Sequence, residues 1–173
     1  MSNTRKLVML SFLTALTIVL ARFLSIQTQV LRISFEFFPI VIAAILFGPL
    51  GAGITAAVAD IIGAMLFPVG TFFPGFTVSA FTTGIIYGLF FYNKNLTWIK
   101  IILAAFTKLV IVDMLMVSSW LLILYKIPLA ALIPTRLIKL AVMMPVEVVL
   151  IYFGARILVM QLQKRTALAS IGS

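Results

Sequence analysis

Long apolar stretches, separated by short groups of glycine, proline and polar residues, cover almost the whole chain. A helix needs about 20 apolar residues to cross the hydrocarbon core of a bilayer, and most of the stretches approach or exceed that length. The pattern predicts an all-α integral membrane protein, a six-transmembrane-helix bundle that forms a single transmembrane domain. The predicted spans lie near residues 7–25, 33–47, 50–67, 75–92, 98–124 and 134–162.

The connections between these spans predict how the bundle is oriented. Gly48 and Pro49 leave room only for a tight turn, so the second and third spans should form an antiparallel hairpin. The loops near 27–32, 67–74 and 125–134 fall on one side. The other side receives a group of basic residues, which by the positive-inside rule makes it cytoplasmic, with both termini: Arg5, Lys6, Lys94, Lys100, Lys164 and Arg165.

Composition agrees with this class and excludes several others. The chain of 173 residues is 64% hydrophobic and 10% charged, against roughly 45–50% and 25% in soluble domains. The net charge is +9, but its basic residues are scattered among apolar spans, which argues against nucleic acid as a partner. Cysteine and histidine are absent, so we expect no thiol or imidazole chemistry, no metal site and no cofactor. The apolar run after Lys6 lacks a small-x-small cleavage site and is interpreted as a span, not a signal peptide.

Small residues at four-residue spacing predict close contacts between helices, because helices in lipid associate by close backbone approach. Ala52 and Ala56 lie on one such face of the third span, and Gly84 and Gly88 lie on one of the fourth. Ser11 and Ala15 form a similar pair in the first span. That pair is either a packing contact inside the bundle or a docking surface for a second membrane protein.

Charged residues inside the predicted spans are the sharper signal, since each costs about 2.5–3.5 kcal/mol at the bilayer centre. Four such residues lie inside the predicted spans: Asp60, Lys108, Asp113 and Glu147. They either pair with one another and fix the packing of the helices, or they contact a ligand. Asp113 and Glu147 are the better candidates for ligand contact.

The sixth span carries a polar stripe. Arg136, Lys139, Met143 and Glu147 return to nearly the same helical face, and Pro145 should leave a backbone carbonyl without its usual partner. A basic mouth above an acidic floor would suit a ligand with a carboxylate tail and a hydrogen-bond-donating head. The alternative is that the outer basic residues extend to lipid headgroups.

The segment 67–77 is rich in phenylalanine, proline and glycine. Pro74 and Gly75 fit the central positions of a type II turn, which would hold Phe72, Phe73 and Phe76 in fixed directions. Aromatic residues at this depth often form only the interfacial belt. A cluster on a preformed turn could instead form a lid over a flat heteroaromatic ring.

Several stretches resemble the substrate-binding S components of energy-coupling factor (ECF) transporters, and most closely the folate-specific branch. They are LTIVLARFLS at 16–25, FPIV at 38–41, FGPLG at 47–51 and, most specifically, FPGFTVSA at 73–80. The resemblance implies a vitamin-binding subunit of a bacterial cell membrane importer, with its site in the outward half. It also implies a complex with a transmembrane coupling subunit, contacted through Ser11 and Ala15, and two cytoplasmic ATPases.

The chain itself has no phosphate-binding loop, so ATP hydrolysis is expected in those partners, and the chain is expected not to be an enzyme. Its smallness and lack of an internal repeat also argue against a complete transporter. The resemblance, taken with the polar stripe and the aromatic segment, implies folate as the ligand and the following contact residues: Arg22, Gln27, Phe72, Phe73, Pro74, Gly75, Phe76, Thr77, Asp113, Trp120, Arg136, Lys139 and Glu147.

Three other functions fit part of the pattern. An S component for riboflavin or another vitamin would use the same stacking surface with different polar contacts. A membrane scaffold of the rod-shape type would bind no small molecule. An intramembrane enzyme is disfavoured, because the sequence contains no recognisable catalytic motif.

Overall fold

A computed structural model describes residues 3–27, 32–68 and 72–171. Five helical segments in this part are long and apolar enough to cross a membrane: Asn3–Arg22, Phe37–Leu66, Pro74–Phe91, Trp98–Tyr125 and Leu132–Gly154. Their length and composition confirm the predicted class, an essentially all-helical protein of the multi-pass membrane type.

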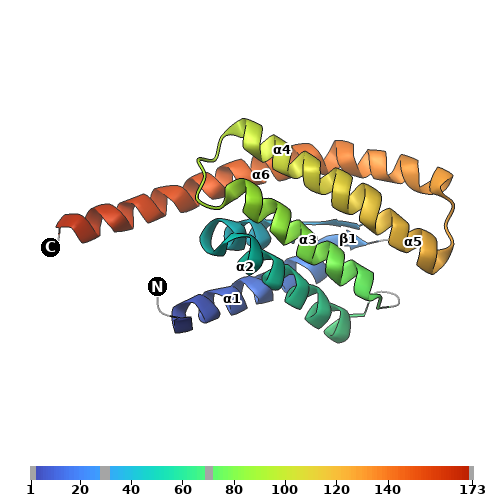
Figure 1. The fold of residues 1–173 in the computed structure, drawn as a ribbon, viewed down its shortest axis with the longest axis horizontal. Helices are drawn as coiled ribbons and strands as arrows, with labels where there is room; N and C mark the ends of the chain where they lie inside the picture. The colour runs from blue at the N-terminus through green and yellow to red at the C-terminus, as the bar shows by residue number, and fades with distance from the viewer. Residues whose placement is uncertain (1–2, 28–31, 69–71, 172–173) are drawn as a thin grey trace.

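The elements follow one another with short connections (Figure 1). Both ends of the chain lie at one end of the bundle together with the α3–α4 connection, and the α2–α3 and α5–α6 connections lie at the opposite end. We call this opposite end the loop end. In order, the elements are α1 (Asn3–Arg22), β1 (Ser25–Gln27), β2 (Arg32–Ser34), α2 (Phe37–Leu66), α3 (Pro74–Phe91), α4 (Trp98–Lys108), the π-helix η1 (Leu109–Met116), α5 (Val117–Tyr125) and α6 (Leu129–Ile171).

Helix α2 is broken where the sequence predicts a turn. Gly48 has φ 77° and ψ −171°, so two helical segments meet there, and Pro49 begins the second. Glycine adopts this backbone conformation without the steric penalty that a side chain would bring. The first segment, residues 37–47, is about 16 Å long at about 1.5 Å per residue, roughly half the thickness of a bilayer core.

A β-hairpin replaces the start of the predicted second span. Strands β1 and β2 pair antiparallel with Ser25 opposite Ser34 and Gln27 opposite Arg32, and helix begins only at Phe37. The expectation of helix from residue 33 is therefore wrong. The hairpin satisfies backbone hydrogen bonds in a segment that is not helical, which is necessary near the bilayer core, and Pro39 fits the first turn of α2 because no helical hydrogen bond is needed there.

Helices α2 and α3 pack against each other through their small residues. A Cβ atom added to Gly84 would overlap the backbone of Ala52 and Gly53, and one added to Gly88 would overlap Pro49. Gly84 lies against Ala52, while Gly88, further along α3, lies against the earlier residue Pro49 of α2. The two segments are therefore antiparallel. This contact is the close backbone approach that the spacing of small residues predicts.

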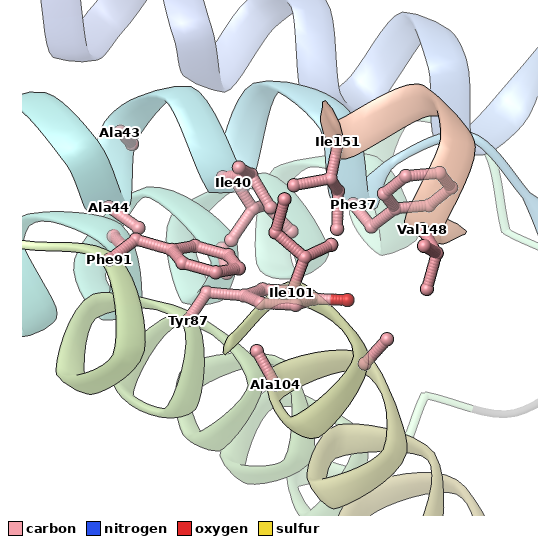
Figure 2. Packing of buried hydrophobic residues seen from close by; sticks show 14 of the residues in the cluster. Phe37, Ile40, Ala43, Ala44, Tyr87, Phe91, Ile101, Ala104, Val148 and Ile151 are labelled. Carbon is pink, nitrogen blue, oxygen red and sulfur yellow. The ribbon is translucent and has the colours of Figure 1, made fainter. Parts of the chain in front are cut away.

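The apolar core joins α2, α3, α4 and α6 (Figure 2). The rings of Tyr87 and Phe91 are stacked with their centroids 5.8 Å apart, beside Phe37, Ile101 and Ile151. Tyr87 is fully buried, so its hydroxyl needs a hydrogen-bond partner inside the protein. That partner belongs to the site described next.

Candidate functional site

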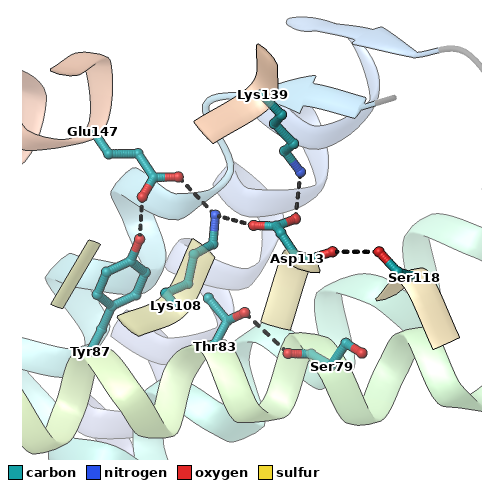
Figure 3. Close-up of polar contacts among 8 residues, drawn as sticks. All are labelled: Ser79, Thr83, Tyr87, Lys108, Asp113, Ser118, Lys139 and Glu147. Carbon is teal, nitrogen blue, oxygen red and sulfur yellow. Dashed lines mark hydrogen bonds and ion pairs between the residues drawn. The ribbon is translucent and has the colours of Figure 1, made fainter. Parts of the chain in front are cut away.

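A buried network of charges links three parts of the bundle (Figure 3). The carboxylate of Glu147, on α6, accepts hydrogen bonds from the Tyr87 hydroxyl at 2.9 Å and the Lys108 ammonium at 2.7 Å. The same ammonium lies 3.1 Å from Oδ2 of Asp113, and Lys139 donates to Oδ1 of Asp113. Three of the four charges predicted inside the spans, Lys108, Asp113 and Glu147, are thus joined in one network, whereas Asp60 lies outside it and contacts Thr77.

The π-helix η1 explains how Lys108 and Asp113 face the same way. In an α-helix, residues five apart point about 140° away from each other at 3.6 residues per turn. The wider π-helical turn, with its i to i+5 hydrogen bonds, brings such residues back to nearly one side. The hydroxyl of Ser118, five residues further on, reaches the backbone oxygen of Asp113 at 3.4 Å, so the same alignment continues into α5.

An aromatic cluster lies between α3 and α5 near the loop end. The ring of Phe73 lies 5.5 Å from that of Trp120 and 6.0 Å from that of Phe76, centroid to centroid. The indole Nε1 of Trp120 donates to the Ser79 hydroxyl at 3.0 Å. A Cβ added to Gly75 would overlap the rings of Phe73 and Trp120, so the rings can approach only because residue 75 is glycine.

The predicted type II turn at Pro74 and Gly75 is wrong. A turn does form, since the Phe76 amide donates to the Phe73 carbonyl at 3.0 Å, but among the glycines of the described residues a positive φ is found at Gly48 and not at Gly75. Pro74 instead occupies the first position of α3, where its fixed φ suits a helix. The cluster is therefore held by a helix N-terminus.

A polar ladder on α3 connects the aromatic cluster to the charges. Gly75, Ser79, Thr83 and Tyr87 follow at steps of four and are all buried. Ser79 contacts Trp120, and Tyr87 contacts Glu147. The prediction from sequence missed Ser79 and Tyr87 as site residues, although their spacing with Thr83 was a usable signal.

The stripe on α6 is buried as a whole: Arg136 is 5% exposed, Lys139 8%, Met143 2% and Glu147 0%. Lys139 and Glu147 belong to the charge network. Pro145 lies inside α6 without ending it.

Other predicted site residues lie apart from this network. The Arg22 guanidinium packs against Gly63 of α2, and the Thr77 hydroxyl donates to Asp60 at 2.8 Å, which joins α3 to α2. Phe72 is half exposed ahead of α3. Gln27 ends β1, and its side chain lies outside the described part of the chain.

Ser11 and Ala15 are exposed on the surface of α1. The buried residues of this helix, Leu13, Thr14, Thr17 and Ala21, lie on the other side. The pair therefore lies on the exposed side of α1, away from its buried side, which favours a docking surface over a packing contact inside the bundle.

Comparison with known proteins gives the class. A sequence model of the family described as ECF-type riboflavin transporter, S component, matches residues 1–164. The Folate transporter FolT of Clostridium novyi is 43% identical over 152 residues, 88% of each chain, and that of Leuconostoc mesenteroides is 36% identical over 157 residues, 87% of this chain and 84% of the relative. A crystal structure of FolT bound with folic acid has a TM-score of 0.83 and 37% identity, and the match covers 88% of this chain and 92% of that one.

The fold and the site thus define a small membrane subunit with a buried polar centre. The chain belongs to the S-component family of ECF-type transporters. Its similar relatives within that family are folate transporters.

Proposed function

We propose that this chain is the folate-binding S component of an ECF-type importer. The observation that carries the proposal is the presence of the aromatic cluster of Phe73, Phe76 and Trp120 near the loop end together with the buried cationic side chains of Arg136 and Lys139 on α6. Folate combines a flat pterin ring with a glutamate tail of two carboxylates. The cluster would stack on the ring, and the cations would attract the tail.

The two acidic residues have a different role from direct ligand contact in this proposal. Both oxygens of Glu147 and both oxygens of Asp113 already have partners within the network. A ligand would have to displace a buried ion pair to reach them, which would cost several kcal/mol. We therefore propose that Asp113 and Glu147 position Lys108 and Lys139.

Riboflavin is the second candidate, because the matching family description names it. Its ring could stack on the same aromatic residues, but its ribityl chain is uncharged and would leave the cations of α6 without an anion. The 43% and 36% identical relatives, both named as folate transporters, also favour folate.

A spectrum tests this choice. The protein is purified in mild detergent from cells grown with both vitamins, denatured, and the released small molecule is recorded by absorbance and mass spectrometry. We expect the folate spectrum, in about one equivalent per chain. Released riboflavin, identified by its mass and its flavin spectrum, would overturn the proposal.

For the membrane arrangement we propose six crossings, with both termini in the cytoplasm. Strands β1 and β2 together with the half-length helix 37–47 make the second crossing, and residues 49–66 make the third. The absence of cysteine makes labelling clean. An Asn95→Cys variant reports the α3–α4 connection and a Lys126→Cys variant the α5–α6 connection, and both native residues are exposed. A membrane-impermeant maleimide on whole cells should label residue 126 only, and the reverse pattern would refute the orientation.

We further propose that α1 docks on a transmembrane coupling subunit that works with two cytoplasmic ATPases. Exposed Ser11 and Ala15 would permit close approach of a partner helix. Ala15→Trp should abolish co-purification of the coupling subunit and leave folate binding intact. Met9→Trp is the matched control, because Met9 is 38% exposed on another side of α1. Equal effects of both variants would contradict this docking face.

A further inference from the structure

The charged side chains buried between α3, η1 and α6 do not balance. Among the described residues, three cations gather here, Lys108, Lys139 and Arg136, against two carboxylates, Asp113 and Glu147. In Figure 3, Lys139 and Lys108 hold Asp113, while Lys108 and Tyr87 hold Glu147. Oδ2 of Asp113 is held by its ion pair with Lys108 and makes no hydrogen bond to any described residue. The two lysines are satisfied by these pairs, and the surplus cation is Arg136.

The guanidinium of Arg136 is buried and incompletely bonded. The residue is 5% exposed, and its Nε and Nη2 atoms make no hydrogen bond to any described residue. Arginine stays protonated in proteins, so the site cannot neutralise it by losing a proton. An unpaired buried charge is strongly unfavourable, and this one lies within an apolar span.

The two open donors are adjacent. Nε–H and Nη2–H lie on the same edge of the guanidinium plane, and together they form a fork that matches the two oxygens of a carboxylate. The two atoms therefore present a bidentate geometry and not merely a positive charge.

The position of Arg136 in the bundle suits the tail of a ligand. It lies about 10 Å along α6 from Leu129, and Trp120 lies about 8 Å along α5 from Tyr125, at about 1.5 Å per residue. Both elements begin or end at the loop end (Figure 1). Arg136 is thus at the depth of the aromatic cluster, and Lys139 and Glu147 follow deeper along α6.

We propose that Arg136 is the anion subsite of this protein and binds a carboxylate of the ligand side-on through Nε and Nη2. The inference rests on the proposed function, since folate supplies the carboxylate. The charge of Asp113 acts on Arg136, but the ion pairs that the structure gives this carboxylate go to Lys108 and Lys139. The ion network thereby keeps the guanidinium fork available for the ligand.

Binding of two probes to purified protein tests the inference: folate, and 6-hydroxymethylpterin, which has the ring but no carboxylate. Arg136→Met should weaken folate binding by about 10- to 100-fold, the loss expected for hydrogen bonds to a charged group, and leave pterin binding unchanged. Arg136→Lys keeps the charge without the fork and should fall between wild type and Arg136→Met. Lys126→Met, which removes an exposed cation, should bind both probes as the wild type does.

Thermal unfolding separates a binding role from a structural one. Without ligand, Arg136→Met should unfold at the wild-type temperature or above it, because it removes an uncompensated charge, and it should lose most of the stabilisation by folate. A clear drop in the unliganded unfolding temperature, or equal losses for folate and pterin, would overturn the inference and leave the proposed function standing. A wild-type protein that binds no folate would overturn the proposed function and the inference with it.

Discussion

Two faces of α3 show opposite ways of packing in a membrane. The face toward α2 includes two glycines, and Gly84 approaches the backbone of Ala52 so closely that an added methyl group would overlap it. The neighbouring face carries Ser79, Thr83 and Tyr87 and meets an indole and a buried carboxylate. The first face packs mainly by close backbone approach, with one polar contact at its edge, from Thr77 to Asp60. The second packs through specific polar partners.

The difference suggests a division of labour. Close contacts between small residues are stable in lipid without any polar group, so the α2–α3 pair can act as a rigid support. The polar face bears costly buried charges that α2–α3 packing does not require. We infer that the polar face is retained for recognition, and the variants below should affect the two faces differently.

The largest effect is expected from changing the helical register of α4 and η1, the segments that carry Lys108 and Asp113. Deletion of Ile102, which is 39% exposed in α4, would rotate Lys108 and all later residues by about 100° and destroy the charge network. Deletion of Ile111, 41% exposed in η1, would let the π-helix return to an α-helix, with Lys108 and Asp113 then four residues apart and still on one face. We expect folded, folate-binding protein only from the second deletion, by size-exclusion chromatography and ligand binding. Equal behaviour of the two deletions would contradict this role of η1.

Removal of the central carboxylate should have the next largest effect. Asp113→Asn leaves Lys139 without the partner that the structure gives it and should lower the free energy of unfolding by about 3–5 kcal/mol. Adding Lys139→Met removes the stranded charge and should restore much of the loss. Unfolding in detergent by denaturant measures both variants; a double variant no more stable than the single one would show that the pair is not the cause.

A methyl group added to each face separates support from recognition. Gly84→Ala forces apart two backbones and should cost about 1–3 kcal/mol of stability or more, with folate affinity unchanged in the protein that remains folded. Gly75→Ala pushes instead on the rings of Phe73 and Trp120, so folate affinity should fall more than stability does. The opposite assignment of the two effects would break the comparison of the two faces.

The smallest effect is expected at the edge of the supporting face. Thr77→Val removes the hydrogen bond to Asp60 and should lower stability by about 1 kcal/mol, while Thr77→Ser should preserve it. Folate affinity should be unaffected by either change. A loss of affinity at constant stability would instead make Thr77 a ligand contact, as the sequence suggests.

Much of this arrangement could be predicted from the sequence, because hydropathy and spacing are local signals. The apolar stretches identify the membrane class, Gly48 with Pro49 marks the break in α2, and the spacing of Arg136, Lys139, Met143 and Glu147 identifies a stripe that is indeed buried.

What the sequence could not provide depends on contacts between distant segments. The hairpin of β1 and β2 is too short for an alternation signal to stand out, and η1 reads as ordinary apolar helix. The π-helical register and the rotation of α6 about its axis determine which residues pair with Lys108. Neither can be predicted from the spacing of residues within one segment. The spacing of Tyr87 from Ser79 and Thr83 predicts a shared helical face, but it does not predict that the Tyr87 hydroxyl binds the carboxylate of Glu147.

Calorimetric titration of the purified chain with folate, and in parallel with riboflavin, tests the central claim most directly. We predict saturable binding of one folate per chain and no detectable binding of riboflavin, because only folate offers both a ring for the aromatic cluster and a carboxylate for Arg136. Saturable riboflavin binding without folate binding would contradict the account.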